Sequence, residues 1–384
     1  MKAAVLGYGT VGAGVYSMLS DAPGMEVGPV LVRPGKAVES FMVSDAALIF
    51  GDPTVDAVVE TLGGLDPAYS YGMRALEAGK HFITANKAMV AAHGLELAAL
   101  AREKGVAFLF SAACGGGVPF LHNLALSAET DRIEAVSGIL NGTTNYMLDA
   151  MQRRSLSYGD ALREAQSLGY AESDPTADVS GLDALRKMQL ACAVAFGVLP
   201  QSGMLCEGME HFTAADVEDI QSRGLVCRLM AHGSRAGESV SAYVEPVLFP
   251  RAAPESSVFT NNNMARYTGK RCGSIVLIGQ GAGRFPTASA VLRDLSATQQ
   301  GARSMFPENC RAAEADNREA VHSYYIRTGG FAAVRLPLRS VLAQGEVVRA
   351  VTEPMSAEKM HALAQNIRKD GNDLFFAALE EKLC

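Results

Sequence analysis

Three glycines directly after a short apolar run constrain the fold of this chain more than any other feature. Residues Lys2–Leu6 predict a buried strand, and Gly7, Gly9 and Gly12 follow in G-x-G-x-x-G spacing, with helix-compatible residues over Val11–Leu19. Such a turn uses one glycine for tightness, one for close approach to a diphosphate and one for helix–strand packing. The N–H groups at the start of the helix bind the phosphates. We therefore expect a dinucleotide site, although a glycine turn in another α/β unit would read the same way.

Strand and helix patterns alternate after this turn. The predicted strands are Val27–Val32, Ala46–Phe50, Val55–Thr61, His81–Thr84 and Val106–Phe110, and the helices between them include Ala68–Ala78 and His93–Glu103. This alternation predicts an α/β fold with a doubly wound parallel sheet of the Rossmann type. Further strands and helices predict a second, α+β domain: Ile133–Leu140, Ser239–Val247 and Ser274–Ile278 as strands, Ser157–Leu168 and Val179–Phe196 as helices.

The end of the second predicted strand bears on the choice between NAD and NADP. An acidic residue there would accept hydrogen bonds from the ribose hydroxyls of NAD. This chain has Arg33 followed by Pro34 instead, and a guanidinium suits a 2′-phosphate. We expect NADP, with NAD left open; the alternative is that Arg33 is simply exposed. Lys87 follows another strand at its carboxyl end, where open α/β sheets bind ligands, so it is a candidate contact for cofactor or substrate.

An acid-rich segment, GYAESDPTADVSGLDALRK at residues 169–187, is the strongest candidate for chemistry. Its loop acids, Glu172 and Asp178 among them, would repel one another unless they faced water or a cationic ligand. Asp183 and Lys187 are four apart and share one face of a helix. Alone, such a pair is usually an ordinary ion pair on a solvated surface. Beside the acidic loop, it suggests a site that binds an ammonium group and delivers a proton from the lysine.

Composition excludes several classes of function. The chain has 384 residues and a net charge of -7, which gives no electrostatic reason to expect nucleic acid or anionic lipid as a partner. No apolar run reaches the ~20 residues of a membrane span, and the N-terminus lacks a signal-peptide pattern. The seven cysteines are scattered without CxxC pairs and the histidines form no ligand cluster. We expect a cytoplasmic protein without disulfides or a transition metal.

Six stretches together resemble the homoserine dehydrogenase family. They are GYGTVGAG (7–14), VVETLGG (58–64), GKHFITANKAMVA (79–91), SGILNGTTNYML (137–148), the acid-rich segment (169–187) and GQGAGRFPTASAV (279–291), in the family's order. The resemblance implies a Rossmann-type domain, a catalytic and dimerisation domain on a second sheet, and a homodimer or larger homo-oligomer. It also implies NAD(P)-linked interconversion of L-aspartate 4-semialdehyde and L-homoserine in threonine and methionine biosynthesis.

The resemblance also implies roles at the matching positions. It puts Thr10 and Val11 on the cofactor diphosphate, Lys87 near the nicotinamide and substrate, and Gly281 in a loop that closes over the cofactor. It places Glu172 and Asp183 on the substrate and Lys187 as the acid/base. Asp178 of the acidic loop and Thr143, in a polar run at the start of a predicted helix, are further substrate-binding candidates from the residues themselves. The chemistry agrees with these assignments, because carboxylates can bind the α-ammonium of homoserine and a lysine can protonate the alkoxide that hydride transfer generates.

One position departs from the family. Ser111 stands where the family usually has a glutamate that takes part in a monovalent-cation site. The carbonyls of Cys114, Gly116 and Val118 could still face a cation, but the charge is gone. We therefore do not expect a strong sodium-like site here.

The predicted domains are 1–130 for the dinucleotide, 131–285 for catalysis and dimerisation, 286–318 as a helical return to the first domain, and 319–384 as a truncated ACT-like module. The last of these reads as strand, strand, helix and strand. Two other functions stay open from the sequence. One is a related oxidoreductase acting on another amino-acid semialdehyde, and the other is a catalytically silent dinucleotide-binding regulator, which would have no use for both Lys87 and Lys187.

Overall fold

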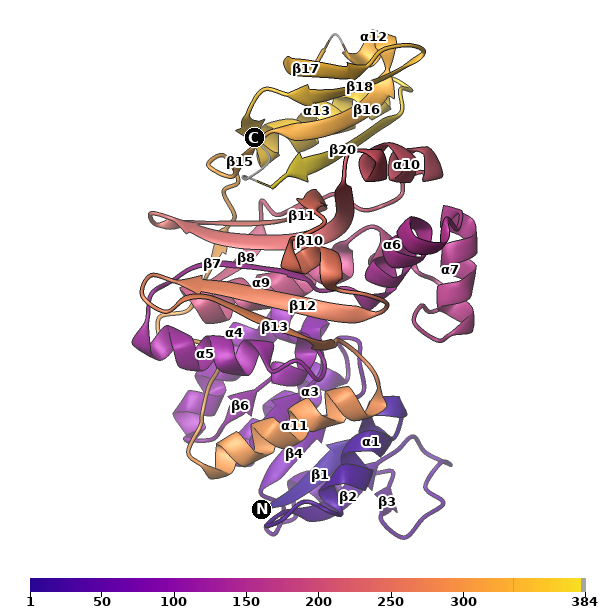
Figure 1. The fold of residues 1–384 in the computed structure, drawn as a ribbon. Helices are drawn as coiled ribbons and strands as arrows, with labels where there is room; N and C mark the ends of the chain where they lie inside the picture. The colour runs from indigo at the N-terminus through magenta and orange to yellow at the C-terminus, as the bar shows by residue number, and fades with distance from the viewer. Residues whose placement is uncertain (334, 381–384) are drawn as a thin grey trace. The chain divides into compact units, whose positions relative to one another are not determined.

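The computed structural model describes residues 1–333 and 335–380, which group into two units (Figure 1). The first unit contains residues 1–133, 189–199 and 269–312, and the second contains the rest of the described chain. Residues 334 and 381–384, which belong to the predicted ACT-like module, lie outside the described part.

Six parallel strands form the sheet of the first unit, in the order β3-β2-β1-β4-β5-β6. They are β1 (Lys2–Leu6), β2 (Glu26–Leu31), β3 (Met42–Val43), β4 (Ala57–Glu60), β5 (His81–Thr84) and β6 (Phe108–Leu109). This is the strand order of a Rossmann fold. The central strands β1 and β4 carry side chains with no exposed surface, such as Val5, Val58 and Val59. The predicted fold class of this unit is confirmed.

Helices accompany this sheet, and local signals set their ends. They are α1 (Thr10–Leu19), α2 (Ala47–Phe50), α3 (Ala68–Glu77), α4 (Lys87–Lys104), α5 (Phe120–Thr130) and α11 (Arg284–Gln299), and β13 (Gly273–Gln280) precedes the last. Asn86 caps α4 by accepting from the Met89 N–H at 3.1 Å, and Gly105 ends it in the left-handed conformation. The helix therefore starts six residues before the predicted His93.

The strand predicted at Ala46–Phe50 is wrong, because these residues form the short helix α2. The Asp45 carboxylate accepts from the Ala47 N–H at 2.8 Å and so favours a helical turn at this point. Ala46 and Ile49 are the buried positions. A spacing of three fits one face of a helix, whereas a half-buried strand would bury alternate residues.

The second unit is built on a mixed sheet with the strand order β12-β7-β10-β11-β20-β16-β18-β17. The strands are β7 (Ile133–Ile139), β10 (Leu225–Ala236), β11 (Ser239–Pro250), β12 (Asn262–Gly269), β16 (Tyr324–Gly329), β17 (Leu338–Ala343), β18 (Val347–Thr352) and β20 (Leu374–Leu379). β10 and β11 form a long antiparallel hairpin, whereas β20 joins β11 in parallel. The sheet core includes Ile139, Met230 and Val247.

The helices of the second unit differ from the prediction at one place. They are α6 (Gly142–Arg154), α7 (Tyr158–Ser167), α8 (Thr176–Val179), α10 (Ala214–Ser222) and the part of α9 (Leu182–Phe196) up to Met188. The single helix predicted over Val179–Phe196 is therefore two helices. Gly181 separates them with a φ of 82°, in the left-handed region that glycine enters without strain.

The C-terminal module, residues 324–379, contains β16, α12 (Gly330–Ala333), β17, β18, α13 (Ala357–Lys369) and β20. Its four strands lie in the order β20-β16-β18-β17, and each neighbouring pair is antiparallel. This is the βαββαβ arrangement of ferredoxin-like modules, with a first helix of only four residues. The predicted strand, strand, helix and strand are all present; the assignment to the ACT type stays a prediction.

Short elements complete the described chain. They are η1 (Ser111–Ala113), η2 (Pro254–Ser257), β9 (Leu205–Cys206) beside β11, and the pairs β8 (Val198–Ser202) with β14 (Arg311–Glu314) and β15 (Val321–His322) with β19 (Met355–Ser356). Among the described helices, none combines the length and the hydropathy needed to cross a bilayer.

Candidate active site

The turn between β1 and α1 shows why glycines are needed there. Gly7 has a φ of 100°, and a Cβ on Gly12 would lie only 2.1 Å from the Gly7 carbonyl oxygen. A Cβ on Gly9 would meet nothing within 4 Å. Gly12 is thus required by the fold itself. The space at Gly9 is of the kind a bound diphosphate would use, so these residues fit a dinucleotide.

The first turn of α1 follows this glycine turn directly. Thr10 and Val11 are its first two residues, and no side chain caps its N-terminus. An uncapped helix N-terminus presents N–H groups and a partial positive charge to an anion. Arg33 lies exposed two residues after β2 ends, where the sequence placed it. The uncapped first turn of α1 and the exposed Arg33 fit the predicted cofactor positions, and the assignments stay predictions.

Gly281 lies against the glycine loop that follows η1. A Cβ on Gly116 would stand 2.5 Å from the Gly281 carbonyl oxygen. The Gly117 N–H donates to the Gln280 carbonyl at 3.0 Å. The two loops of the first unit are therefore in backbone contact, and Gly116 cannot carry a side chain unless one of them moves.

The carboxyl ends of β4 and β5 are organised by Glu60, which sequence reasoning did not single out. Its carboxylate accepts from Thr84 Oγ1 at 2.5 Å and from the Leu62 N–H at 2.6 Å. Burial raises the pKa of Glu60, while these hydrogen bonds oppose the rise. Lys87 is half-buried one residue after the α4 cap. The sequence around Glu60, VVETLGG, contains no pattern that distinguishes a buried glutamate from an exposed one.

Ser111 and the loop after it are bonded to other parts of the first unit, and the expected weakness of a cation site here stays a prediction. Ser111 is buried, and both its N–H and its hydroxyl donate to the carboxyl of Asp294 on α11. Burial raises the pKa of Asp294 to about 7, although these two hydrogen bonds oppose the rise. The Val118 carbonyl accepts from the Phe120 N–H at 2.7 Å. Among the described residues, no group of three or more His, Cys, Asp or Glu could hold a metal ion.

A buried cluster in the second unit brings together residues of the two most distinctive stretches. The Asn141 amide donates to Asp178 Oδ1 at 2.7 Å and to Asp183 Oδ2 at 2.9 Å. Lys187 Nζ donates to the same Asp183 oxygen at 2.7 Å and to the Leu140 carbonyl at 2.6 Å. Asp183 and Lys187 are each 9% exposed. This is not the solvated surface pair that an Asp-x-x-x-Lys spacing usually gives.

Three local features assemble this cluster. Asn141 is the N-cap of α6, where its Oδ1 accepts from the Thr144 N–H at 2.8 Å and its Nδ2 stays available for the acids. The break at Gly181 separates Asp178, in α8, from Asp183, in the first turn of α9. One further helical turn brings Lys187 beneath Asp183.

The electrostatics of the cluster favour a cationic ligand. Burial raises the pKa of Asp178, and the neighbouring Asp183 carboxylate contributes to the rise. The described hydrogen bonds to Asp178 come from the neutral side chains of Asn141 and Thr143, and a buried carboxylate is stabilised by a nearby positive charge. A bound ammonium group would provide that charge.

Two other predicted substrate residues lie differently. Thr143, in the first turn of α6, donates to the Tyr170 carbonyl and to Asp178 Oδ2, the latter at 3.3 Å, so it belongs to the cluster. Glu172 is exposed in the loop before α8, and its main-chain carbonyl accepts from Gln166. The contacts of the described residues do not tie the Glu172 carboxylate to the cluster, and its role stays a prediction.

Comparison with known proteins decides the family. The homoserine dehydrogenase of Corynebacterium glutamicum is 40% identical over 314 residues, which cover 76% of this chain and 70% of that protein. This chain belongs to the homoserine dehydrogenase family. The family models agree: the one described as the homoserine dehydrogenase NAD binding domain matches residues 7–111, and the one described as homoserine dehydrogenase matches residues 119–296.

Other members of the homoserine dehydrogenase family are also similar to this chain. The Synechocystis sp. enzyme is 37% identical over 313 residues, covering 77% of this chain and 72% of the relative. A solved homoserine dehydrogenase from Thiobacillus denitrificans matches 99% of this chain and 98% of its own with a TM-score of 0.87 and 29% identity. The chain is therefore an NAD(P)-dependent oxidoreductase that acts on a CH–OH group, and the two alternative functions are not favoured.

Proposed function

We propose that this chain reduces L-aspartate 4-semialdehyde to L-homoserine with Lys187 as the proton donor and NADPH as the preferred cofactor. The observation that carries the proposal is the buried cluster of Asn141, Asp178, Asp183 and Lys187 in a chain of this family. The first unit is assigned to the dinucleotide and the second to the amino-acid substrate.

The carboxylates Asp178 and Asp183 bind the α-ammonium of the substrate. Asn141 holds both of them in place by hydrogen bonds from one amide group. A carboxylate attracts a positive charge, so this site favours an aldehyde that carries an ammonium group over one that does not. Thr143 and Glu172 complete the substrate contacts in this proposal.

Lys187 delivers a proton to the oxygen that becomes the hydroxyl of homoserine. NADPH, when bound, supplies the hydride that reduces the aldehyde carbon. Lys187 is positioned for its role by Asp183 and by the Leu140 carbonyl, which fix its Nζ atom. A proton donor held in this way stabilises the alkoxide as charge develops on it. Lys87, at the carboxyl edge of the first sheet, is assigned to the nicotinamide end of the site.

The cofactor-binding residues are assigned to the β1–α1 turn and its surroundings. Gly7, Gly9 and Gly12 shape the turn, and the N–H groups of Thr10 and Val11 receive the diphosphate. Gly281 lies in the loop that closes over the cofactor.

Lys187→Ala tests the proton-transfer role. We expect kcat to fall at least about 100-fold, as for loss of a general acid, while calorimetry shows NADPH binding close to wild type. Arg186→Ala is the matched control, because Arg186 is the exposed neighbour on the same helix. Persistent turnover in Lys187→Ala would show that another group provides the proton.

Cofactor preference is tested by initial rates with NADH and NADPH at equal concentration. Arg33 is exposed after β2, and no acid replaces it there. We expect the faster rate with NADPH, and Arg33→Ala should reduce that preference because the 2′-phosphate loses its cation. An unchanged ratio in the variant would remove Arg33 from the site. A homodimer or larger homo-oligomer and a cytoplasmic location also stay predictions.

A further inference from the structure

The segment from Cys206 to His211, here called segment 206–211, lies against the turn that carries Asp178. The Met209 N–H donates to the Val179 carbonyl at 2.9 Å. A Cβ on Gly208 would stand 2.2 Å from that same carbonyl oxygen and 2.6 Å from the Cα of Ser180. The segment therefore touches the backbone directly after Asp178 so closely that position 208 admits glycine alone.

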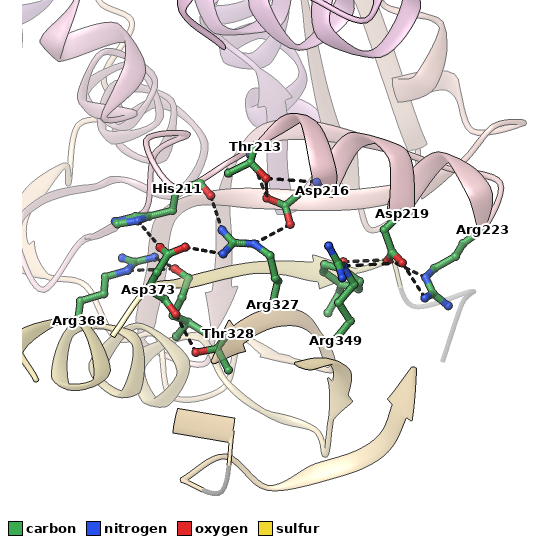
Figure 2. A network of polar contacts seen from close by, with 12 residues as sticks. His211, Thr213, Asp216, Asp219, Arg223, Arg327, Thr328, Arg349, Arg368 and Asp373 are labelled. Carbon is green, nitrogen blue, oxygen red and sulfur yellow. Dashed lines mark hydrogen bonds and ion pairs between the residues drawn. The ribbon is translucent and has the colours of Figure 1, made fainter. Parts of the chain in front are cut away.

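The same segment is also bonded to the C-terminal module. Arg368 on α13 binds Glu207 through two parallel bonds, Nη1 to Oε2 at 2.9 Å and Nη2 to Oε1 at 2.6 Å. Further along, Arg327 donates to the His211 carbonyl at 2.8 Å, and the His211 ring contacts Asp373 at 3.0 Å (Figure 2). Arg327, Arg368 and Asp373 of the module thus each form a bond to segment 206–211.

The pair of Arg368 and Glu207 is joined by two hydrogen bonds. Glu207 is 7% exposed, and the Arg368 guanidinium is also fixed by the Leu374 carbonyl at 2.7 Å. A two-bond pair between guanidinium and carboxylate defines orientation as well as energy. Loss of the arginine would leave a buried carboxylate without its counter-charge, so Glu207 would have to move.

We propose that Arg368 and Glu207 are positioning residues for substrate binding. They fix segment 206–211, and through Gly208 and Met209 this segment fixes the α8 turn and hence the Asp178 carboxylate. This inference rests on the proposed function, in which Asp178 binds the substrate ammonium. The C-terminal module is then part of the support of the amino-acid site. It acts on the affinity for the amino acid and leaves the cofactor site of the first unit alone.

Arg368→Met in the full chain tests this coupling by steady-state kinetics with NADPH and aspartate semialdehyde. We expect KM for the semialdehyde to rise about tenfold or more, with kcat and KM for NADPH changed less than about twofold, since a lost positioning contact weakens substrate binding alone. Glu207→Gln should give the same split. The double variant should be no worse than either single one, because the two residues act as one unit.

Arg335→Met is the matched control. Arg335 forms an exposed ion pair with Asp370 on the same module, and its contacts with the described residues include none to segment 206–211. All constants should therefore equal those of wild type. If Arg368→Met fails to fold, judged by circular dichroism, Arg368→Lys can be used instead. Lysine keeps the positive charge but cannot form the two parallel bonds of the guanidinium, so KM for the semialdehyde should show a smaller rise.

The coupling would be overturned if the wild type is active and Arg368→Met has the same KM for the semialdehyde. Equal changes in the constants for both substrates would also overturn it, because they would indicate a general loss of structure. A wild type without semialdehyde reductase activity would instead refute the proposed function. Calorimetric titration with homoserine would then still report on the coupling, because weaker binding to Arg368→Met than to wild type is expected and equal binding would overturn it.

Discussion

At the scale of single residues, the side chain of Asn141 has two structural functions. Its oxygen caps α6 through the Thr144 N–H, and its nitrogen donates to Asp178 and Asp183. An amide can do both because it has acceptor and donor ends. Helix stability and substrate-site geometry therefore depend on the same side chain.

Asn141→Ser should separate the two functions. Serine can cap a helix almost as well as asparagine, so stability should change by less than about 1 kcal/mol. Its hydroxyl cannot bond both acids, so KM for aspartate semialdehyde should rise in steady-state assays. Asn141→Ala should lose both functions. A serine variant with normal KM would show that the bridge does not position the carboxylates.

The glycine turn offers a second separation at residue scale. Gly9 has extended backbone angles that alanine can adopt, and its Cβ would meet no protein atom within 4 Å. Gly9→Ala should therefore fold normally but weaken NADPH binding at least about tenfold by calorimetry, a loss of about 1.4 kcal/mol. Gly12→Ala should lower the melting temperature as well, because its Cβ would overlap the Gly7 carbonyl. Normal NADPH affinity in Gly9→Ala would argue against a diphosphate at this turn.

At the scale of elements, α11 and η1 are joined by one buried carboxyl. Asp294 receives the N–H and the hydroxyl of Ser111 and has a pKa of about 7 in the fold. The glycine loop after η1 is therefore held by a side chain of α11. The usual pKa of an aspartate is 3.8, so the folded chain binds a proton here that the unfolded chain has already lost between these two values.

This difference predicts a pH dependence of stability. Because the folded pKa is raised, the contribution of Asp294 is full below about pH 4 and is lost as pH rises toward about 7, by up to about 1.4 kcal/mol per pH unit. The free energy of unfolding, measured with urea, should fall between pH 5 and pH 7, and it should fall less for Asp294→Asn than for wild type. Parallel losses in the two proteins would contradict the raised pKa.

At the scale of the whole molecule, the C-terminal module is built into the second unit. β20 extends the sheet by pairing with β11 in parallel. Arg327 on β16 binds Asp216 on α10 at 2.8 Å, and the Asp216 side chain has no exposed surface (Figure 2). Asp216 also accepts from Thr213 in a capping box. The module thus shares both a sheet and a buried ion pair with the rest of its unit.

Removing this ion pair should destabilise the chain strongly. Arg327→Met would leave the buried Asp216 carboxylate without a counter-charge, at a cost of about 3–5 kcal/mol in denaturant unfolding. Arg223→Met is the control, because its partner Asp219 lies on the same helix but the arginine side chain is 30% exposed; it should cost less than about 1 kcal/mol. Equal effects would mean that the module is not held by this pair.

The sequence by itself determined the parts of this protein that depend on neighbouring residues. The glycine spacing after Lys2–Leu6 and the alternation of apolar runs predicted the parallel sheet, and the spacing of Asp183 and Lys187 predicted their pairing, because these are local periodicities. The helix at Ala47–Phe50 was misread as a strand because a run of five apolar residues fits both. Only the tertiary structure decided which polar residues meet. Asn141 contacts acids 37 and 42 positions away. The burial of Asp183 and Lys187, which distinguishes them from an ordinary surface ion pair, results from the packing of the whole chain and cannot be read from one segment.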